Sequence, residues 1–155
     1  MRIFVDADAC PKVIREILYR ASKRTGVELI LVANRYLHVP VTPLIKVIIV
    51  ASGIDEADKQ IAELVCAGDL VITADIPLAD IVVTKNGIAL NPRGTLYTKE
   101  NIKRSLATRN LMEQLRDNKV ISGGPPVFNK SDSESLANQL DKILAQAKNK
   151  IQSYL

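Results

Sequence analysis

Five aspartates follow apolar segments of this chain, each at a point where a buried strand is expected to end. Asp6 and Asp8 follow one apolar run, Asp55 and Asp58 follow another, and Asp75 follows a third. Converging carboxylates repel one another, which raises their pKa values unless a cation lies between them. Carboxylate oxygens suit Mg²⁺ or Mn²⁺, which retain waters and accept a substrate phosphate at their open positions. The pattern therefore predicts a Mg²⁺ or Mn²⁺ site.

We expect Asp6 and Asp75 to bind such an ion directly, and Asp8, Asp55 and Asp58 to bind it directly or through water. An ion held there would supply hydroxide for in-line attack on a phosphodiester and would offset charge on the leaving oxygen. The predicted activity is a metal-dependent nuclease. Its catalytic residues would be Asp6, Asp8, Asp58 and Asp75.

Most of these residues also have a purely structural interpretation. Asp55 is placed to cap a helix, and Asp58 would complement the positive end of the same helix. Asp8 or Cys10 could cap a helix that begins at Pro11. Asp6 is harder to explain in this way, because a carboxylate that ends a buried strand needs a partner.

Short apolar runs alternate with helical patterns in the first half of the chain. The expected strands cover residues 2–6, 28–33, 46–51, 69–74 and 88–90, and the expected helices cover 11–24 and 55–67. This rhythm predicts a three-layer, doubly wound α/β fold with a mainly parallel sheet. The carboxyl ends of such strands share one edge, where ligands bind. We expect a single domain over residues 1–155.

The rest of the chain is expected to be a helical extension. Thr98 can cap a helix that either breaks near Thr108 or packs on two sides, and residues 123–126, Gly-Gly-Pro-Pro, break the pattern. Ser131 and Glu134 have capping-box spacing and would begin the last helix. Its apolar stripe, residues 136–151, is expected to pack within the chain. The alternative is packing on a second subunit, which would give a homodimer.

Composition limits the class of protein. Of the 155 residues, 47% are hydrophobic and 25% are charged, which is typical of a globular domain and argues against disorder. The longest apolar runs are far shorter than a membrane span. Two cysteines are too few for a disulfide framework or a thiolate metal site. We therefore expect a cytoplasmic protein without a membrane partner.

Neither Cys10 nor the single histidine is predicted to be catalytic. Cys10 beside a helix start could be nucleophilic, but His38 lies in a distant loop and nothing marks it as a general base. We therefore interpret Cys10 as a packing residue.

Positive charge is concentrated in the second half. Residues 1–75 have nine basic and ten acidic side chains, whereas residues 76–155 have twelve and seven. A nucleic acid, RNA in particular, is the expected partner of such a surface; a solvated basic face is the plainer alternative. The candidate contacts are Asn34, Arg93, Lys99, Lys103, Arg104 and Arg109. No aromatic cluster accompanies these basic residues, so sequence-specific base recognition is not expected.

Several motifs resemble one bacterial family over nearly the whole chain. They are Val5-Asp6-Ala7-Asp8-Ala9-Cys10-Pro11, Val32-Ala33-Asn34, Gly53-Ile54-Asp55-Glu56-Ala57-Asp58, Thr73-Ala74-Asp75-Ile76-Pro77 and Asn91-Pro92-Arg93-Gly94. They resemble the uncharacterised YaiI/YqxD family, which is similar to PIN-like domains, many of them metal-dependent ribonucleases. The resemblance implies a PIN-like parallel sheet and a metal site at Asp6, Asp58 and Asp75. Asp55 or Asp58 would replace the glutamate that such nucleases usually carry on a mid-chain helix.

Two other functions remain open. The segment Asp6-Ala7-Asp8 after an apolar strand is similar to haloacid-dehalogenase-like phosphatases, in which Asp6 would be the nucleophile and Asp8 the general acid. A non-catalytic regulatory module that binds nucleic acid is the third possibility. It would show salt-dependent binding without metal-dependent cleavage.

Overall fold

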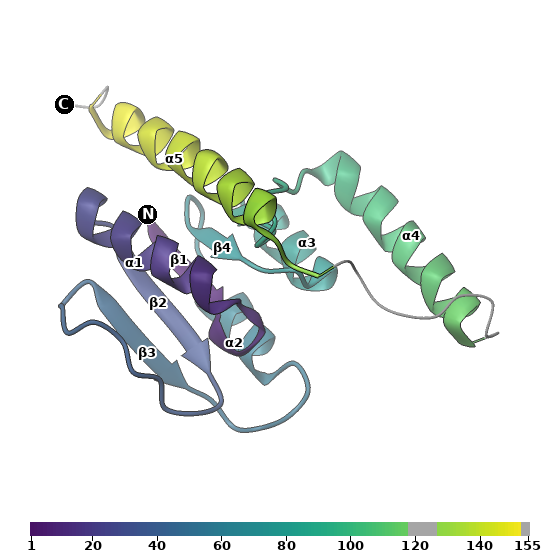
Figure 1. Cartoon of the computed structure of the whole chain (residues 1–155). Coiled ribbons are helices and arrows are strands. Elements are labelled where there is room, and N and C mark those ends of the chain that lie inside the picture. The colour runs from purple at the N-terminus through teal and green to yellow at the C-terminus, as the bar shows by residue number, and fades with distance from the viewer. Residues whose placement is uncertain (118–126, 153–155) are drawn as a thin grey trace.

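A five-stranded parallel sheet forms the centre of the computed structural model (Figure 1), which describes residues 1–117 and 127–152. The side chains of residues 109, 113, 116, 117, 151 and 152 are outside that description. The strands are β1 (Arg2–Asp6), β2 (Glu28–Ala33), β3 (Ile45–Ile49), β4 (Leu70–Ile72) and β5 (Ile88–Leu90). Their order is β3-β2-β1-β4-β5, and every neighbouring pair is parallel. The predicted α/β class is confirmed.

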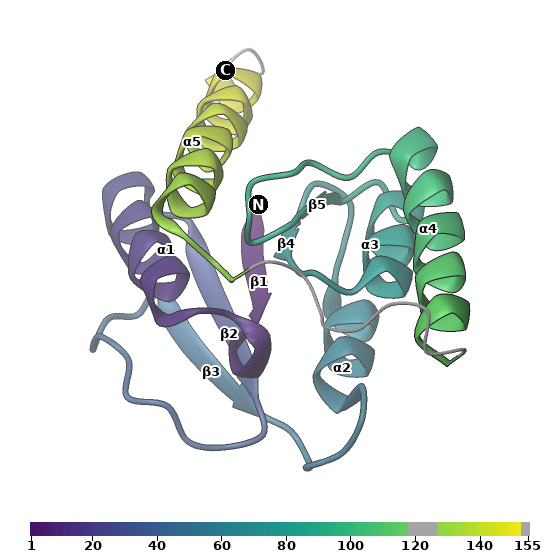
Figure 2. The ribbon, with the colours of Figure 1, turned by 45° about the vertical axis from the view of Figure 1, so that its right-hand side comes forward.

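Helices cover both faces of the sheet, as a three-layer fold requires (Figures 1 and 2). α1 (Lys12–Thr25) and α5 (Lys130–Gln152) pack with Ile3 and Val5 of β1. α2 (Glu56–Leu64), α3 (Ile76–Thr84) and α4 (Lys99–Asp117) cover the side that Phe4 faces. Alternate residues of β1 thus enter opposite layers, which explains why its three central residues, Ile3, Phe4 and Val5, are all apolar.

The last helix packs within the chain. Leu136, Leu140, Ile143 and Leu144 are buried in the same cluster as the apolar face of α1. The predicted helix start at Ser131 is wrong. Asn129 and Asp132 cap the helix reciprocally, each accepting a hydrogen bond from the other's backbone N–H at 3.0 Å. The same three-residue spacing occurs two positions earlier than predicted, with Asn and Asp in the two capping roles.

α4 is one continuous helix through Thr108, capped as predicted at Thr98. Thr98 Oγ1 accepts a hydrogen bond from Asn101 N–H at 3.1 Å, and Asn101 Oδ1 accepts one from Thr98 N–H at 2.7 Å. Ile102 is buried against the layer that contains α3, whereas Leu111 is exposed. The predicted breaker at residues 123–126 is outside the described residues.

Sequence periodicity missed α3. Its residues are almost all apolar, and Leu78, Ala79 and Val82 are buried. A helix this apolar shows no contrast between an inner and an outer face, so the helical period does not stand out.

Other expected elements end earlier than predicted. β3 stops at Ile49, β4 at Ile72 and α2 at Leu64.

Asp69, directly before β4, is buried and joins the start of β1 to the start of β4. Its carboxylate accepts hydrogen bonds from Arg2 N–H at 3.0 Å, from the Arg2 guanidinium at 2.8 Å and from Cys66 N–H at 2.9 Å. Hydrogen bonding to Asp69 raises the pKa of Arg2. The ion pair therefore helps to set the position of the two central strands.

No helix of the described residues is long and apolar enough to span a membrane.

Candidate metal centre

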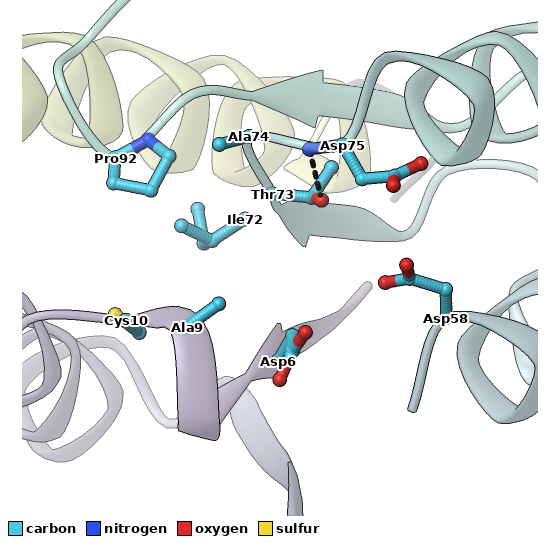
Figure 3. Close-up of a pocket in the computed structure, with 9 residues that line it drawn as sticks. All are labelled: Asp6, Ala9, Cys10, Asp58, Ile72, Thr73, Ala74, Asp75 and Pro92. Carbon is cyan, nitrogen blue, oxygen red and sulfur yellow. Dashed lines mark hydrogen bonds between the residues drawn. The ribbon is translucent and has the colours of Figure 1, made fainter. Parts of the chain in front are cut away.

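A pocket of about 320 Å³ lies at the carboxyl ends of β1 and β4 (Figure 3). The chain continues from β1 to β2 and β3 on one side, then crosses to β4 and β5 on the other. Such a reversal of strand order leaves a crevice beyond the strand ends, where ligands bind in open α/β sheets. The pocket is lined by Asp6, Ala9, Cys10, Asp58, Ile72, Thr73, Ala74, Asp75 and Pro92.

Asp75 enters the pocket from the first turn of α3, which it caps. Its Oδ1 accepts a hydrogen bond from Leu78 N–H at 2.8 Å, and its own N–H donates to Thr73 Oγ1 at 2.9 Å. Pro77 follows in the first turn, where its missing N–H costs nothing. These local bonds fix the direction of the carboxylate, which faces that of Asp58 in Figure 3.

Asp58 comes from the first turn of α2, and Asp55 precedes this helix. Asp55 has a positive φ of 64° and makes no side-chain capping bond, so the cap predicted for it is absent. One carboxylate oxygen from each of Asp55, Asp58 and Asp75 lies within 4.8 Å of the other two. Three carboxylates this close could hold one cation, with oxygen donors of the kind that Mg²⁺ and Mn²⁺ prefer.

The environment of Asp58 shows why a cation fits there. Its Oδ1 is buried without a hydrogen-bond partner in the described structure. Loss of solvent around the carboxyl, followed by the negative charges of Asp75, Asp6 and Asp55, raises its pKa from 3.8 to about 7. Without a metal this site needs a proton, and a divalent cation would replace that proton.

Asp6 lies at the end of β1 and borders two pockets. Its carboxylate accepts a hydrogen bond from Asp8 N–H at 3.2 Å across the short turn η1 (Ala7–Ala9). Burial raises its pKa, against the lowering effect of backbone N–H groups. The second pocket, about 160 Å³, also contains Asp8, Asn34, Asp55 and Asp58. Asp6 and Asp58 therefore stand between the two pockets.

Asp8 holds the loop that follows β2. Its Oδ2 accepts a hydrogen bond from Asn34 N–H at 2.7 Å, and its Oδ1 lies 3.9 Å from Arg35 Nε. Neither Asp8 nor Cys10 caps α1, since the residue before this helix is Pro11 and no side chain caps it. The alternative interpretation, in which one of them caps α1, is therefore excluded.

Cys10 lines the first pocket as a buried thiol. Burial raises its pKa to about 12, so it is protonated at neutral pH and a poor nucleophile. His38 is exposed and lines neither pocket. Cys10 is thus buried, as expected of a packing residue, and His38 lies outside both pockets.

The predicted nucleic-acid contacts lie in different parts of the fold. Asn34 lines the second pocket. The exposed side chains of Lys99, Lys103 and Arg104 are on the first two turns of α4. α4 packs against α3, at the edge of the molecule in Figure 2. The side chain of Arg109 is outside the described residues.

Arg93 is engaged with α5. Its guanidinium lies 2.7 Å from Asp132 and stacks over the ring of Phe128, with 5.7 Å between the guanidinium carbon and the ring centroid. The turn at Gly94 packs closely against α5. A Cβ at this position would lie 2.6 Å from the backbone of Ser135, which is too close for a side chain. Since Pro92 lines the first pocket, this contact connects the pocket wall to the start of α5.

The fold and the carboxylate cluster together define an α/β protein with a candidate divalent-metal centre at the sheet's switch point. The chain belongs to the uncharacterised bacterial YaiI/YqxD family, whose model matches residues 4–146. It is 54% identical over 151 residues to a UPF0178 protein of Maridesulfovibrio salexigens, covering 97% of this chain and all of that protein.

A second relative, a UPF0178 protein of Thioalkalivibrio sulfidiphilus, is 56% identical over 146 residues, which cover 94% of this chain and 99% of the relative. A third, from Colwellia psychrerythraea, is 53% identical over 148 residues, with 96% and 98% of the two chains covered. No solved structure gives a significant match. The comparisons therefore establish the family but name no activity.

The pKa of Asp58 predicts how stability depends on pH in the metal-free protein. The folded state holds this proton up to about pH 7, whereas the unfolded chain releases it near 3.8, so this contribution to stability is lost as pH rises. After allowance for partial solvent screening, we expect wild type to lose on the order of 1–2 kcal/mol more than Asp58→Asn between pH 5 and 8. Urea unfolding in EDTA would measure this. Parallel curves for the two proteins would contradict it.

The contacts of Arg93 predict a structural contribution. Arg93→Ala removes the ion pair with Asp132 and the stacking on Phe128, so we expect the free energy of unfolding to fall by about 1–3 kcal/mol. Lys103→Ala, which removes an exposed cation from α4, should change it by less than about 0.5 kcal/mol. Thermal and urea unfolding would compare the two variants. Equal stability of both would show that the contact contributes little.

Proposed function

We propose that the protein is a Mg²⁺- or Mn²⁺-dependent nuclease that hydrolyses phosphodiester bonds, with RNA as its substrate. The observation that carries this proposal is the partnerless, buried oxygen of Asp58 within a cluster of carboxylates. Such an oxygen is costly unless a proton or a cation satisfies it. A divalent ion there would activate water and stabilise charge on a phosphate.

Asp6, Asp58 and Asp75 are the residues proposed to hold the ion, with Asp55 as a further ligand. The cap of α3 fixes Asp75, and η1 fixes Asp6, so these ligands are positioned before the ion binds. Asp58 accepts or loses a proton near pH 7. The Asp58 carboxyl can therefore hold a proton when the ion is absent and release that proton when the ion binds.

The basic second half supports a polyanionic substrate. Lys99, Lys103 and Arg104 are exposed on α4 and available for phosphate contacts. A contact between Arg93 and phosphate would have to compete with its ion pair to Asp132. The resemblance to PIN-like domains adds support for RNA, although a fold by itself does not determine a function.

The geometry favours a nuclease over a phosphatase that uses Asp6 as nucleophile. That mechanism needs Asp8 as the proton donor to the leaving group. Asp8 instead accepts a hydrogen bond from Asn34 N–H and faces Arg35 with its other oxygen. This arrangement suits holding the loop after β2 rather than donating a proton.

Cleavage of a fluorescently labelled single-stranded RNA in the presence of Mn²⁺ tests the proposed function. We expect Asp75→Asn to lose at least about 100-fold in rate, because asparagine retains the cap of α3 but not the charge. Asp80→Asn, which changes an exposed carboxylate on the same helix, should cleave like wild type.

Three outcomes would contradict the proposal. Wild type that cleaves nothing in Mg²⁺ or Mn²⁺ but binds RNA would indicate a non-catalytic module. Equal cleavage by wild type and Asp75→Asn would place the activity elsewhere. Cleavage that persists undiminished in EDTA would exclude a metal-dependent reaction.

A further inference from the structure

The loop after β2 carries an exposed arginine and an exposed tyrosine beside the candidate metal centre. Arg35 has 73% of its side chain exposed, and Tyr36 is 77% exposed. Asn34, directly before them, lines the second pocket together with Asp6 and Asp58. Arg35 and Tyr36 thus directly follow a residue of the pocket that shares Asp6, Asp55 and Asp58 with the candidate metal centre.

Two anchors hold this short segment in place. At its start, Asn34 N–H donates to Asp8 Oδ2 at 2.7 Å. At its end, Leu37 is buried in the core cluster of α1. Two residues span at most about 7 Å of backbone, so the Cα of Tyr36 lies no farther than that from the Cα of Asn34. The tyrosine is therefore an exposed side chain two residues from the pocket lining, on a loop that is held on both sides.

The segment between β3 and α2 also contributes to the second pocket and carries an exposed apolar side chain. Ile54 is 89% exposed and stands between Gly53 and Asp55, both of which line the pocket. Two of the segments that line this acidic pocket therefore carry exposed side chains, an arginine and a tyrosine after Asn34 and an isoleucine before Asp55. A ligand with a flat apolar face and a negative charge fits these surroundings.

Arg35 is free to exchange partners. Its Nε lies 3.9 Å from Asp8, a separation longer than a hydrogen bond. An exposed ion pair of this kind contributes at most about 1 kcal/mol. A phosphate could therefore take over the guanidinium without disrupting the loop, because Asp8 would still hold the backbone of Asn34.

We propose that Arg35 and Tyr36 form a nucleotide subsite of the enzyme, in which Tyr36 stacks on an unpaired base and Arg35 contacts the phosphate that neighbours the scissile one. Bases in a duplex already stack on one another, so only a strand with unpaired nucleotides at the cleavage site can use this subsite. The proposal rests on the proposed nuclease function and adds that the substrate is single-stranded at this point.

Binding, rather than cleavage, tests the subsite. The probe is a fluorescein-labelled, phosphorothioate-substituted RNA octamer, which resists hydrolysis, measured by anisotropy in Mg²⁺ with and without its complementary strand. Wild type should bind the single strand at least about 10-fold more tightly than the duplex. Tyr36→Ala should weaken single-strand binding about 10-fold, as expected for the loss of one stacked base.

Two further variants serve as matched controls. Tyr36→Phe retains the ring and should bind within about 3-fold of wild type. Val41→Ala shortens a fully exposed side chain in the same connection between β2 and β3 and should bind like wild type. Arg35→Ala should weaken binding and reduce its dependence on salt, because one phosphate contact is lost.

Several results would overturn the subsite. They are undiminished single-strand binding by Tyr36→Ala, an equal loss in Tyr36→Phe, and duplex binding as tight as single-strand binding. The outcome is separable from the nuclease proposal. If wild type cleaves RNA while Tyr36→Ala binds normally, the subsite is wrong and the nuclease stands. If Tyr36 is needed for binding but wild type cleaves nothing, the subsite stands and the catalytic function is wrong.

Discussion

Electrostatic repulsion within a half-buried pocket is the constraint on which the candidate site depends. Asp55, Asp58 and Asp75 form one close cluster, and Asp6 lines both pockets together with Asp58. One oxygen of Asp58 is buried without a hydrogen-bond partner in the described structure. A fold tolerates such a cluster only when a proton or a cation compensates the charge. Burial of the Asp58 carboxyl, together with the negative charges of its neighbours, raises its pKa when no metal is bound.

The architecture supports this cluster with bonds that lie outside it. The strand order places β1 beside β4, so that their carboxyl ends meet at the pocket. The ion pair of Arg2 with Asp69 joins the same two strands at their other ends, where they begin. The pocket wall at Pro92 is connected to α5 through Arg93 and Asp132. The site therefore depends on both helical layers, and a change at the start of α5 should shift the pocket wall at Pro92.

Much of the fold and the central site could be predicted from sequence, because both follow from local patterns. The apolar runs predict the strands. The rule that ligands bind at the carboxyl ends of parallel strands predicts that Asp6, Asp58 and Asp75 lie at one sheet edge, and all three line the first pocket. α3 was missed because an all-apolar helix has no visible period. The buried pair of Arg2 and Asp69 was missed because residues far apart in sequence give no local signal.

A calorimetric titration with Mn²⁺ at pH 7.5 would test the central claim most directly, using wild type, Asp58→Asn and Asp80→Asn. We predict saturable binding by wild type and by Asp80→Asn, and at least about a 10-fold weaker affinity for Asp58→Asn. Binding to wild type should also release protons, measurable as a dependence of the heat on the buffer's ionisation enthalpy. No saturable binding by wild type, or equal binding by all three proteins, would contradict the assignment of this cluster as a metal centre.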